Sequence, residues 1–247
     1  MTRHRKSSRA FNTSSDSPAI RHIAVVAVAV VIVLAFAAVH GQWSPMHRWN
    51  RAFGDASVVL VALSMGIGPL ARLVRPTVRL LRFRRELGIY GCLLAIVHTT
   101  IILVGWVQWD LMRFFGFEWH PQLQGYVMVQ QGFGLANGIG LAAVFLACIL
   151  ALTSNDLSQR RLGASAWKFL QMGVLPLWWL TVAHVAYFLF LHFMSFHRET
   201  PAPNPLQIWF VGLVIVVLGL RSSAYLRTAL AKQAAPKSEK GVDHAAV

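Results

Sequence analysis

The sequence predicts an all-α integral membrane protein: a six-helix transmembrane bundle with both the N- and C-termini in the cytoplasm. Composition is the first reason, because 56% of the 247 residues are hydrophobic and 13% are charged, whereas soluble domains carry about a quarter charged residues. The second reason is a set of six long apolar runs, and the third is the concentration of Lys and Arg in alternate loops. One membrane domain accounts for this length, so we expect no separate soluble flavin or nicotinamide domain.

The apolar runs define the predicted spans. Each run has about 20 residues or more, and a helix of about 20 residues, rising about 1.5 Å per residue, crosses a hydrocarbon core of roughly 30 Å. Lipid offers no partner for unpaired backbone N–H and C=O groups, so each span is expected to be helical. No internal repeat is evident among the runs. We place the spans at residues 20–40, 55–73, 86–107, 134–153, 168–195 and 206–225.

The six-span domain is therefore predicted to cover residues 20–228. A basic cytoplasmic tail at residues 1–19 precedes it, and a polar tail at residues 229–247 follows it. The second tail is short and rich in Ala and Lys, so we expect it to be disordered.

The distribution of charge sets the predicted orientation. Basic residues cluster in the two tails and in the loops after the second and fourth spans, which all fall on one side of a six-span chain. The positive-inside rule makes that side cytoplasmic. The positive-inside rule therefore accounts for the net charge of +14. For that reason we expect membrane lipid, and no nucleic acid, as a partner. The opposite loops carry tryptophans typical of an aromatic belt at the outer interface, namely Trp43, Trp49, Trp106, Trp109 and Trp119.

Two of the ten histidines lie well inside predicted spans, away from the span ends. His98 is in "GIYGCLLAIVHTTIILVGW", residues 88–106, and His184 is in "LPLWWLTVAHVAYFLFLHF", residues 175–193. An ionisable side chain within a span is costly and marks a candidate functional site. The structural alternative is an imidazole that only hydrogen-bonds to a neighbouring helix.

The depths of these two histidines connect them. His98 lies 13 residues beyond Arg85, roughly 20 Å along a helix, and His184 lies 17 beyond Trp167, roughly 25 Å. Both spans run outward, so both imidazoles are expected at similar height in the outer half of the membrane. Facing imidazoles in a helix bundle suit axial ligation of haem iron. Zinc is the weaker alternative, because it takes four ligands and we expect no carboxylate near this depth.

Two longer segments resemble a known family. "GPLARLVRPTVRLLRFRRELGIYGCLLAIVH", residues 68–98, and "ALTSNDLSQRRLGASAWKFLQ", residues 151–171, are similar to ferric-reductase-like transmembrane domains. The likeness is greatest to the haem-binding membrane subunits of bacterial periplasmic protein-methionine-sulfoxide reductase systems. The resemblance implies a b-type haem held by His98 and His184 in the inner (plasma) membrane of a bacterium.

The chain departs from the family pattern at the position of a further histidine. Gln171 stands where the family has the first histidine of its fifth span, and Met172 beside it is a candidate ligand. Arg84, rather than a histidine, lies 14 residues before His98, so we expect one haem. Tyr90 and His197 are further candidates for cofactor contacts. The guanidinium groups of Arg84 and Arg85 could bind haem propionates, a flavin phosphate or an anionic lipid.

The resemblance also implies a function. We expect an electron-transfer subunit of an oxidoreductase system, which takes electrons from quinol or a flavin reductase and delivers them to a soluble extracytoplasmic reductase. Flavin mononucleotide (FMN) and quinone are therefore candidate cofactors that no residue pattern identifies. One alternative is the membrane component of a ferric or other metal reductase. The other is a transporter or scaffold without haem, whose histidines are structural.

Overall fold

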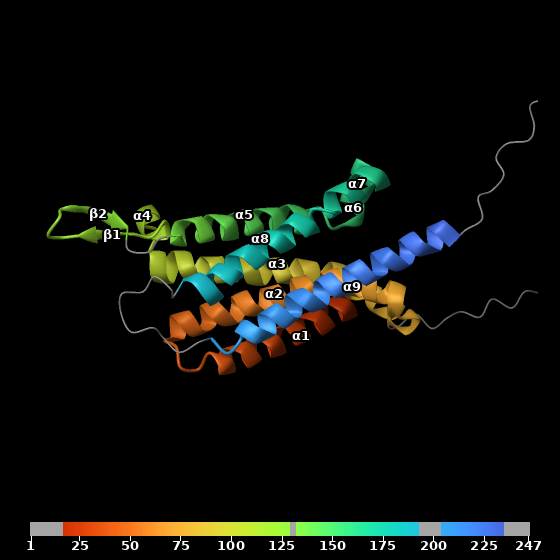
Figure 1. The fold of residues 1–247 in the computed structure, drawn as a ribbon, viewed down its shortest axis with the longest axis horizontal. Coiled ribbons are helices and arrows are strands. Elements are labelled where there is room, and N and C mark those ends of the chain that lie inside the picture. The colour runs from red at the N-terminus through yellow and green to blue at the C-terminus, as the bar shows by residue number, and fades with distance from the viewer. Residues whose placement is uncertain (1–16, 129–131, 193–203, 235–247) are drawn as a thin grey trace, which may run out of the picture.

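The computed structural model describes residues 17–128, 132–192 and 204–234. Within these residues, six helical segments are long and apolar enough to cross a membrane, which confirms the predicted all-helical bundle. They lie lengthwise beside one another (Figure 1). The spans are α1 (Pro18–Val39), α2 (Pro45–Leu73), α3 (Arg84–Ile101), α5 (Phe133–Leu152), the pair α7 (Ala164–Gln171) and α8 (Val174–Ala186), and α9 (Gln207–Ala234).

Short elements mark the two ends of the bundle. At one end, a helical turn α4 (Leu111–Phe114) leads into an antiparallel hairpin of β1 (Phe117–His120) and β2 (Gly125–Met128). At the other end lie the 3₁₀ helix η1 (Arg75–Phe83) and α6 (Asp156–Leu162). We call these the hairpin end and the η1 end (Figure 1). The arginine-rich loops are at the η1 end, so the positive-inside rule predicts that this end faces the cytoplasm.

Helix α2 is the centre of the bundle. In its most apolar stretch 61% of the residues are buried, against 11–22% in the other spans, so the outer helices present most of their surface to lipid. It packs against α1, α3 and α9. Small residues such as Ala52 and Ala56, both fully buried, allow the close backbone approach on which helix packing in lipid depends. On another face, Met65 packs against the fully buried Trp178 of α8.

The structure extends two of the predicted spans. Helix α2 begins at Pro45, ten residues before the predicted start, and α9 continues to Ala234, beyond the predicted domain boundary at residue 228. Polar residues such as Asn50 and Arg51 lower the hydropathy of the first turns of α2. They line an internal cavity, where polar side chains are tolerated, so hydropathy alone underestimated the length of this helix. Residues 1–16 and 235–247, most of the two predicted tails, lie outside the described residues.

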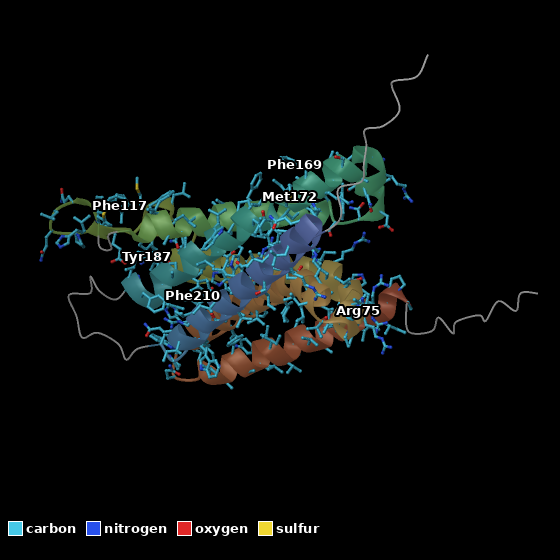
Figure 2. All side chains as sticks on the ribbon, turned by 45° about the vertical axis from the view of Figure 1, so that its right-hand side comes forward. Arg75, Phe117, Phe169, Met172, Tyr187 and Phe210 are labelled. Carbon is cyan, nitrogen blue, oxygen red and sulfur yellow. The ribbon has the colours of Figure 1, made fainter. Side chains whose placement is uncertain are left out.

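The fifth span is interrupted between α7 and α8. Pro176 lies in the first turn of α8 and has no backbone N–H to donate to the carbonyl of Met172, which breaks the helical ladder at that point. Phe169, just before the interruption, and Met172, within it, are labelled in Figure 2 and are 75% and 55% exposed. The span thus consists of two helices joined at residues 172–173.

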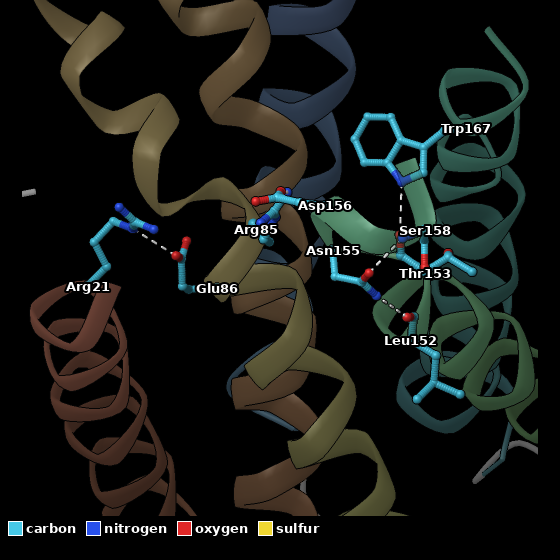
Figure 3. Close-up of polar contacts among 9 residues, drawn as sticks. All are labelled: Arg21, Arg85, Glu86, Leu152, Thr153, Asn155, Asp156, Ser158 and Trp167. Atoms are coloured by element: carbon cyan, nitrogen blue, oxygen red, sulfur yellow. Dashed lines mark hydrogen bonds and ion pairs between the residues drawn. The ribbon is translucent and has the colours of Figure 1, made fainter. Parts of the chain in front are cut away.

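Polar contacts tie the helices together at the η1 end (Figure 3). Arg21 Nε donates to the buried carboxylate of Glu86 at 2.8 Å and joins α1 to α3, while Arg85 joins α3 to α6 through Asp156 at 2.7 Å. The Asn155 side chain accepts from the backbone N–H of Ser158 and caps α6, which satisfies one of the free donors at the start of the helix.

Candidate functional site

The structure brings His98 and His184 together inside the bundle. Their ring centroids are 6.3 Å apart and their planes are nearly perpendicular, at 87°. They come from α3 and α8, and both line a single cavity of about 1140 Å³. Counting residues along two parallel spans therefore predicted a real spatial pair.

Each imidazole is oriented by a backbone carbonyl of a neighbouring helix. Nδ1 of His98 lies 2.9 Å from the carbonyl oxygen of Asn50, and Nδ1 of His184 lies 2.8 Å from that of Ala136. A carbonyl oxygen only accepts, so each Nδ1 carries the proton and donates it. Each Nε2 then keeps its lone pair, and no hydrogen bond to either Nε2 is found among the described residues. This is the arrangement of a metal-binding histidine held by an outer hydrogen bond.

Two glycines allow the imidazoles to approach these carbonyls. A Cβ atom on Gly54 would lie 2.9 Å from Nδ1 of His98, and a Cβ atom on Gly140 would lie 2.5 Å from Nδ1 of His184. Each glycine follows its accepting carbonyl by four residues, one helical turn along the same face. The sequence analysis did not identify either glycine, although each lies 44 residues before the histidine that packs on it.

The two halves of the site repeat each other. In each half the histidine follows its glycine by 44 residues, from 54 to 98 and from 140 to 184. Each histidine-bearing helix also widens into a π-helix shortly afterwards, over Ile102–Val107 and over Tyr187–Leu191. Such segments are rare and often occur at functional sites. The span sequences had not revealed this internal correspondence.

The cavity wall beside the histidines is aromatic and apolar. The rings of Phe188 and His184 are 5.0 Å apart, and Phe133 contacts both Phe188 and Trp106 edge to face. Phe133, Phe188 and Trp106 all line the cavity. Tyr187, labelled in Figure 2, lies on the same span; its ring packs against Phe188 and is not among the lining residues.

This set of groups fits a haem. Two imidazoles bound to one metal through nitrogens about 2 Å away have centroids roughly 6 Å apart, which matches the observed separation. The apolar walls suit a porphyrin, and both imidazoles are neutral in this hydrogen-bonding arrangement. Among the described residues, no group of three or more His, Cys, Asp or Glu is placed to hold a metal ion.

The expectation that no carboxylate lies near the two histidines was wrong. Asp55 follows Gly54 and lines the same cavity, although no carboxylate was expected near the histidines. Its Oδ2 is 2.7 Å from Nε2 of His40, whose side chain is 1% exposed. The predicted span began at residue 55, which placed this carboxylate at the membrane surface, whereas α2 begins ten residues earlier and carries it inside.

The secondary candidates lie away from the histidine pair. The Gln171 amide donates to the carbonyl of Leu150 at 3.3 Å and to Oγ1 of Thr153 at 3.1 Å, so it serves to join α7 to α5. Gln171 and Met172 both line the cavity nearer its η1 end. Tyr90 does not line it; its hydroxyl faces α1, 3.3 Å from Nδ1 of His22. His197 lies outside the described residues.

The two candidate arginines are also at the η1 end. Arg84 Nε donates to the carbonyl of Ser64 at 3.2 Å. Arg85 forms the ion pair with Asp156 shown in Figure 3, and this hydrogen bond holds the pKa of Asp156 below its ordinary value. Arg84 begins α3, and the 14 residues from it to His98 correspond to roughly 20 Å.

The sequence of this chain matches a known protein family. The family model described as ferric reductase like transmembrane component matches residues 24–182, a segment that includes His98 and ends two residues before His184.

Three curated relatives are each described as the heme-binding subunit MsrQ of a protein-methionine-sulfoxide reductase. The chain is 28% identical over 145 residues to that of Herminiimonas arsenicoxydans and 29% identical over 141 residues to that of Caulobacter vibrioides. These matches cover 56% and 57% of this chain, and 60% of each relative's length. To that of Bordetella parapertussis it is 26% identical over 186 residues, which cover 74% of this chain and 78% of the relative.

Proposed function

Since the chain belongs to the ferric reductase-like transmembrane component family, we propose that it is a membrane b-type cytochrome that relays electrons through one haem ligated by His98 and His184. The observation that carries this proposal is the pair of imidazoles from α3 and α8, whose ring centroids are 6.3 Å apart; each Nδ1 donates to a backbone carbonyl, and no hydrogen bond to either Nε2 is found among the described residues. The relatives named as haem-binding subunits support it.

Bound haem would supply one-electron chemistry. The residues of this chain then have distinct roles. His98 and His184 would hold the iron, and donation from each Nδ1 to a carbonyl would fix the ring and raise the basicity of Nε2. Phe133, Phe188 and Trp106 exclude water and keep the surroundings of low polarity, which is one of the ways a protein sets a reduction potential.

The proposed direction of transfer follows from the position of the site. Both accepting carbonyls, of Asn50 and Ala136, belong to the first two turns of helices that begin at the hairpin end (Figure 1). We propose that this end faces outward in a bacterial inner membrane, so that electrons leave to a soluble reductase on that side. The donor would be quinol within the bilayer or a flavin-containing protein at the η1 end. Reduction of the purified protein by a flavin reductase but not by quinol analogues would exclude quinol as the direct donor.

Absorption spectroscopy tests the haem. Protein produced with sufficient haem and solubilised should show a Soret band, and sharp α and β bands after dithionite. His98→Ala and His184→Ala should each abolish the low-spin spectrum, whereas Gln171→Ala should preserve it. A colourless wild-type preparation would reject the proposal in favour of structural histidines.

The family description also supports a second candidate function, the membrane component of a ferric or other metal reductase. In that case, the reduced protein should be reoxidised by a soluble ferric chelate alone. Reoxidation that requires an added partner reductase would favour the relay.

A further inference from the structure

An arginine lies one helical turn from the histidine pair, in the wall of the same cavity. Arg51 is on α2, three residues before Gly54, the residue against which the ring of His98 packs. Both Arg51 and Gly54 line the cavity, as expected for residues three apart on one face of a helix. Because α2 begins at the hairpin end (Figure 1), Arg51 lies between that end and Gly54.

The Arg51 side chain is held in place without using its hydrogen-bond donors. Its Cζ atom lies 3.8 Å from the centroid of the Trp43 ring, so the guanidinium is held over that ring. A cation–π contact uses the face of a guanidinium and leaves the N–H groups in its plane able to donate. Within the described residues, this guanidinium makes no hydrogen bond or ion pair. Arg51 is therefore a half-buried cation whose donors can bind a molecule in the cavity.

The acidic residue that lines this part of the cavity is paired with a different side chain. Asp55 lies one turn further along α2, and its Oδ2 is 2.7 Å from Nε2 of His40. The positive charge of Arg51 also reaches His47 and His192, which line the cavity from α2 and from the outer part of the fifth span. An anion bound here would thus meet a guanidinium and two imidazoles, while the nearby carboxylate already has a partner.

The side chain next to Arg51 is a second polar group available to a ligand. The Asn50 side chain is 9% exposed and lines the cavity, and its Oδ1 has no hydrogen-bond partner among the described residues. The backbone carbonyl of the same residue accepts from His98, so this amide lies beside the histidine pair. Rotation of the amide presents two N–H donors in place of the oxygen. Buried polar groups normally have a partner, and a ligand in the cavity would supply one.

The haem of the proposed cytochrome brings two carboxylates into this cavity. A carboxylate removed from water is stable only when it is paired or hydrogen-bonded. A guanidinium suits it, because two parallel N–H···O bonds can form between the planar groups. Arg51 is closer to the histidine pair than Arg84, which lies 14 residues before His98 on α3, roughly 20 Å along the helix.

We propose that Arg51 and the Asn50 side chain bind a haem propionate at the hairpin end of the cavity. This inference rests on the proposed function, since it assigns residues to the haem that His98 and His184 would hold. It also sets the orientation of the porphyrin, whose propionate edge then faces the end of the bundle from which electrons are proposed to leave.

Reconstitution with haem and with haem dimethyl ester tests the carboxylate contact. The ester keeps the iron and the porphyrin but lacks both negative charges. Haem-free protein is loaded with either compound, and its transfer to excess apomyoglobin is followed by absorbance. The wild type should release the ester roughly tenfold or more faster than haem, because the ester cannot form the charge-assisted hydrogen bonds.

Matched variants assign this difference to Arg51. In Arg51→Gln the preference for haem over the ester should disappear, whereas Arg51→Lys keeps the charge without the fork and should retain part of it. Asn50→Ala should reduce the preference less than Arg51→Gln, because its amide is neutral. The control is Arg48→Gln. Arg48 donates to the carbonyl of Ala37 and does not line the cavity, so this variant should prefer haem as strongly as the wild type.

Equal release of haem and ester by the wild type, or an undiminished preference in Arg51→Gln, overturns the proposal. Should Arg51→Gln not fold, phenylglyoxal labelling of the wild type decides instead, with the labelled arginines identified by peptide mass spectrometry. Haem should protect Arg51 from labelling and the ester should not; equal labelling overturns the proposal.

Failure of this inference is distinguishable from failure of the cytochrome. A low-spin haem spectrum that requires His98 and His184, combined with equal release of haem and ester, rejects the role of Arg51 and keeps the cytochrome. A wild type that binds neither porphyrin rejects both.

Discussion

Gly140 lies directly against the imidazole of His184, so closely that a Cβ atom on the glycine would be 2.5 Å from Nδ1. Gly54 holds the same relationship to His98 at 2.9 Å. In both cases the missing side chain lets the ring reach a carbonyl one turn earlier in the glycine's helix. The hydrogen bond to that carbonyl sets the tautomer of each proposed ligand, and it can form only because the neighbouring span has a glycine, without a Cβ atom, at this position.

Substitution of these glycines should therefore weaken haem retention. Gly140→Ala forces the ring of His184 or the helix to move, and such overpacking costs typically 1–3 kcal/mol, or roughly five- to 150-fold in affinity. Gly54→Ala should have a smaller effect in the same direction, because its contact is longer. The measurement is haem transfer to apomyoglobin, followed by absorbance.

Gly138→Ala is the matched control for that experiment. It lies on α5 two residues from Gly140, and a Cβ atom there meets nothing within 4 Å. Alanine is a better helix former than glycine by about 1 kcal/mol, so this variant should retain haem and be slightly more stable. Equal haem loss from the Gly138 and Gly140 variants would refute the steric account.

The carboxylate of Asp55 should lower the reduction potential of the haem. It lines the same cavity next to Gly54, and a nearby negative charge stabilises the more positive, oxidised iron. Asp55→Asn should therefore raise the midpoint potential, by an amount on the order of tens of mV, measured by redox titration. Asp110→Asn, at the exposed cap of α4, is the control. A fall in potential for Asp55→Asn would contradict this assignment.

Gln171 should contribute to stability and not to the spectrum. Its amide donates to Leu150 and Thr153, and the loss of such hydrogen bonds costs about 1 kcal/mol. Gln171→Ala should lower the thermal midpoint of the solubilised protein while the α and β bands stay in position. A changed spectrum would show that the side chain reaches the iron.

The ion pair between Arg85 and Asp156 should be sensitive to acid. The hydrogen bond from Arg85 holds the pKa of Asp156 below its ordinary value of 3.8, so the pair is complete at neutral pH. Its contribution is lost only as the pH falls through that lowered pKa. Carboxyl ¹³C NMR of labelled Asp should show the low pKa in the wild type and a rise toward the ordinary value in Arg85→Gln. An unchanged pKa would mean that the contact is not maintained in solution.

The sequence by itself determined the six spans and the shared depth of two histidines. Both follow from simple physics: a chain in lipid must be helical, and a helix rises by a fixed amount per residue, so depth can be counted from a basic loop. The same reasoning failed for the start of α2, because polar residues that line an internal cavity resemble surface residues in a hydropathy profile.

Tertiary structure alone decided which groups meet. Hydropathy does not fix how each helix is rotated about its axis or which helix lies beside it. For that reason Gly54 and Gly140, the pairing of His40 with Asp55 and the position of Asn50 and Arg51 beside the histidine pair emerged only from the packed bundle. Each of these contacts joins residues from different helices or distant turns, and packing between helices in lipid depends on small residues and hydrogen bonds that leave little trace in the sequence of a single span.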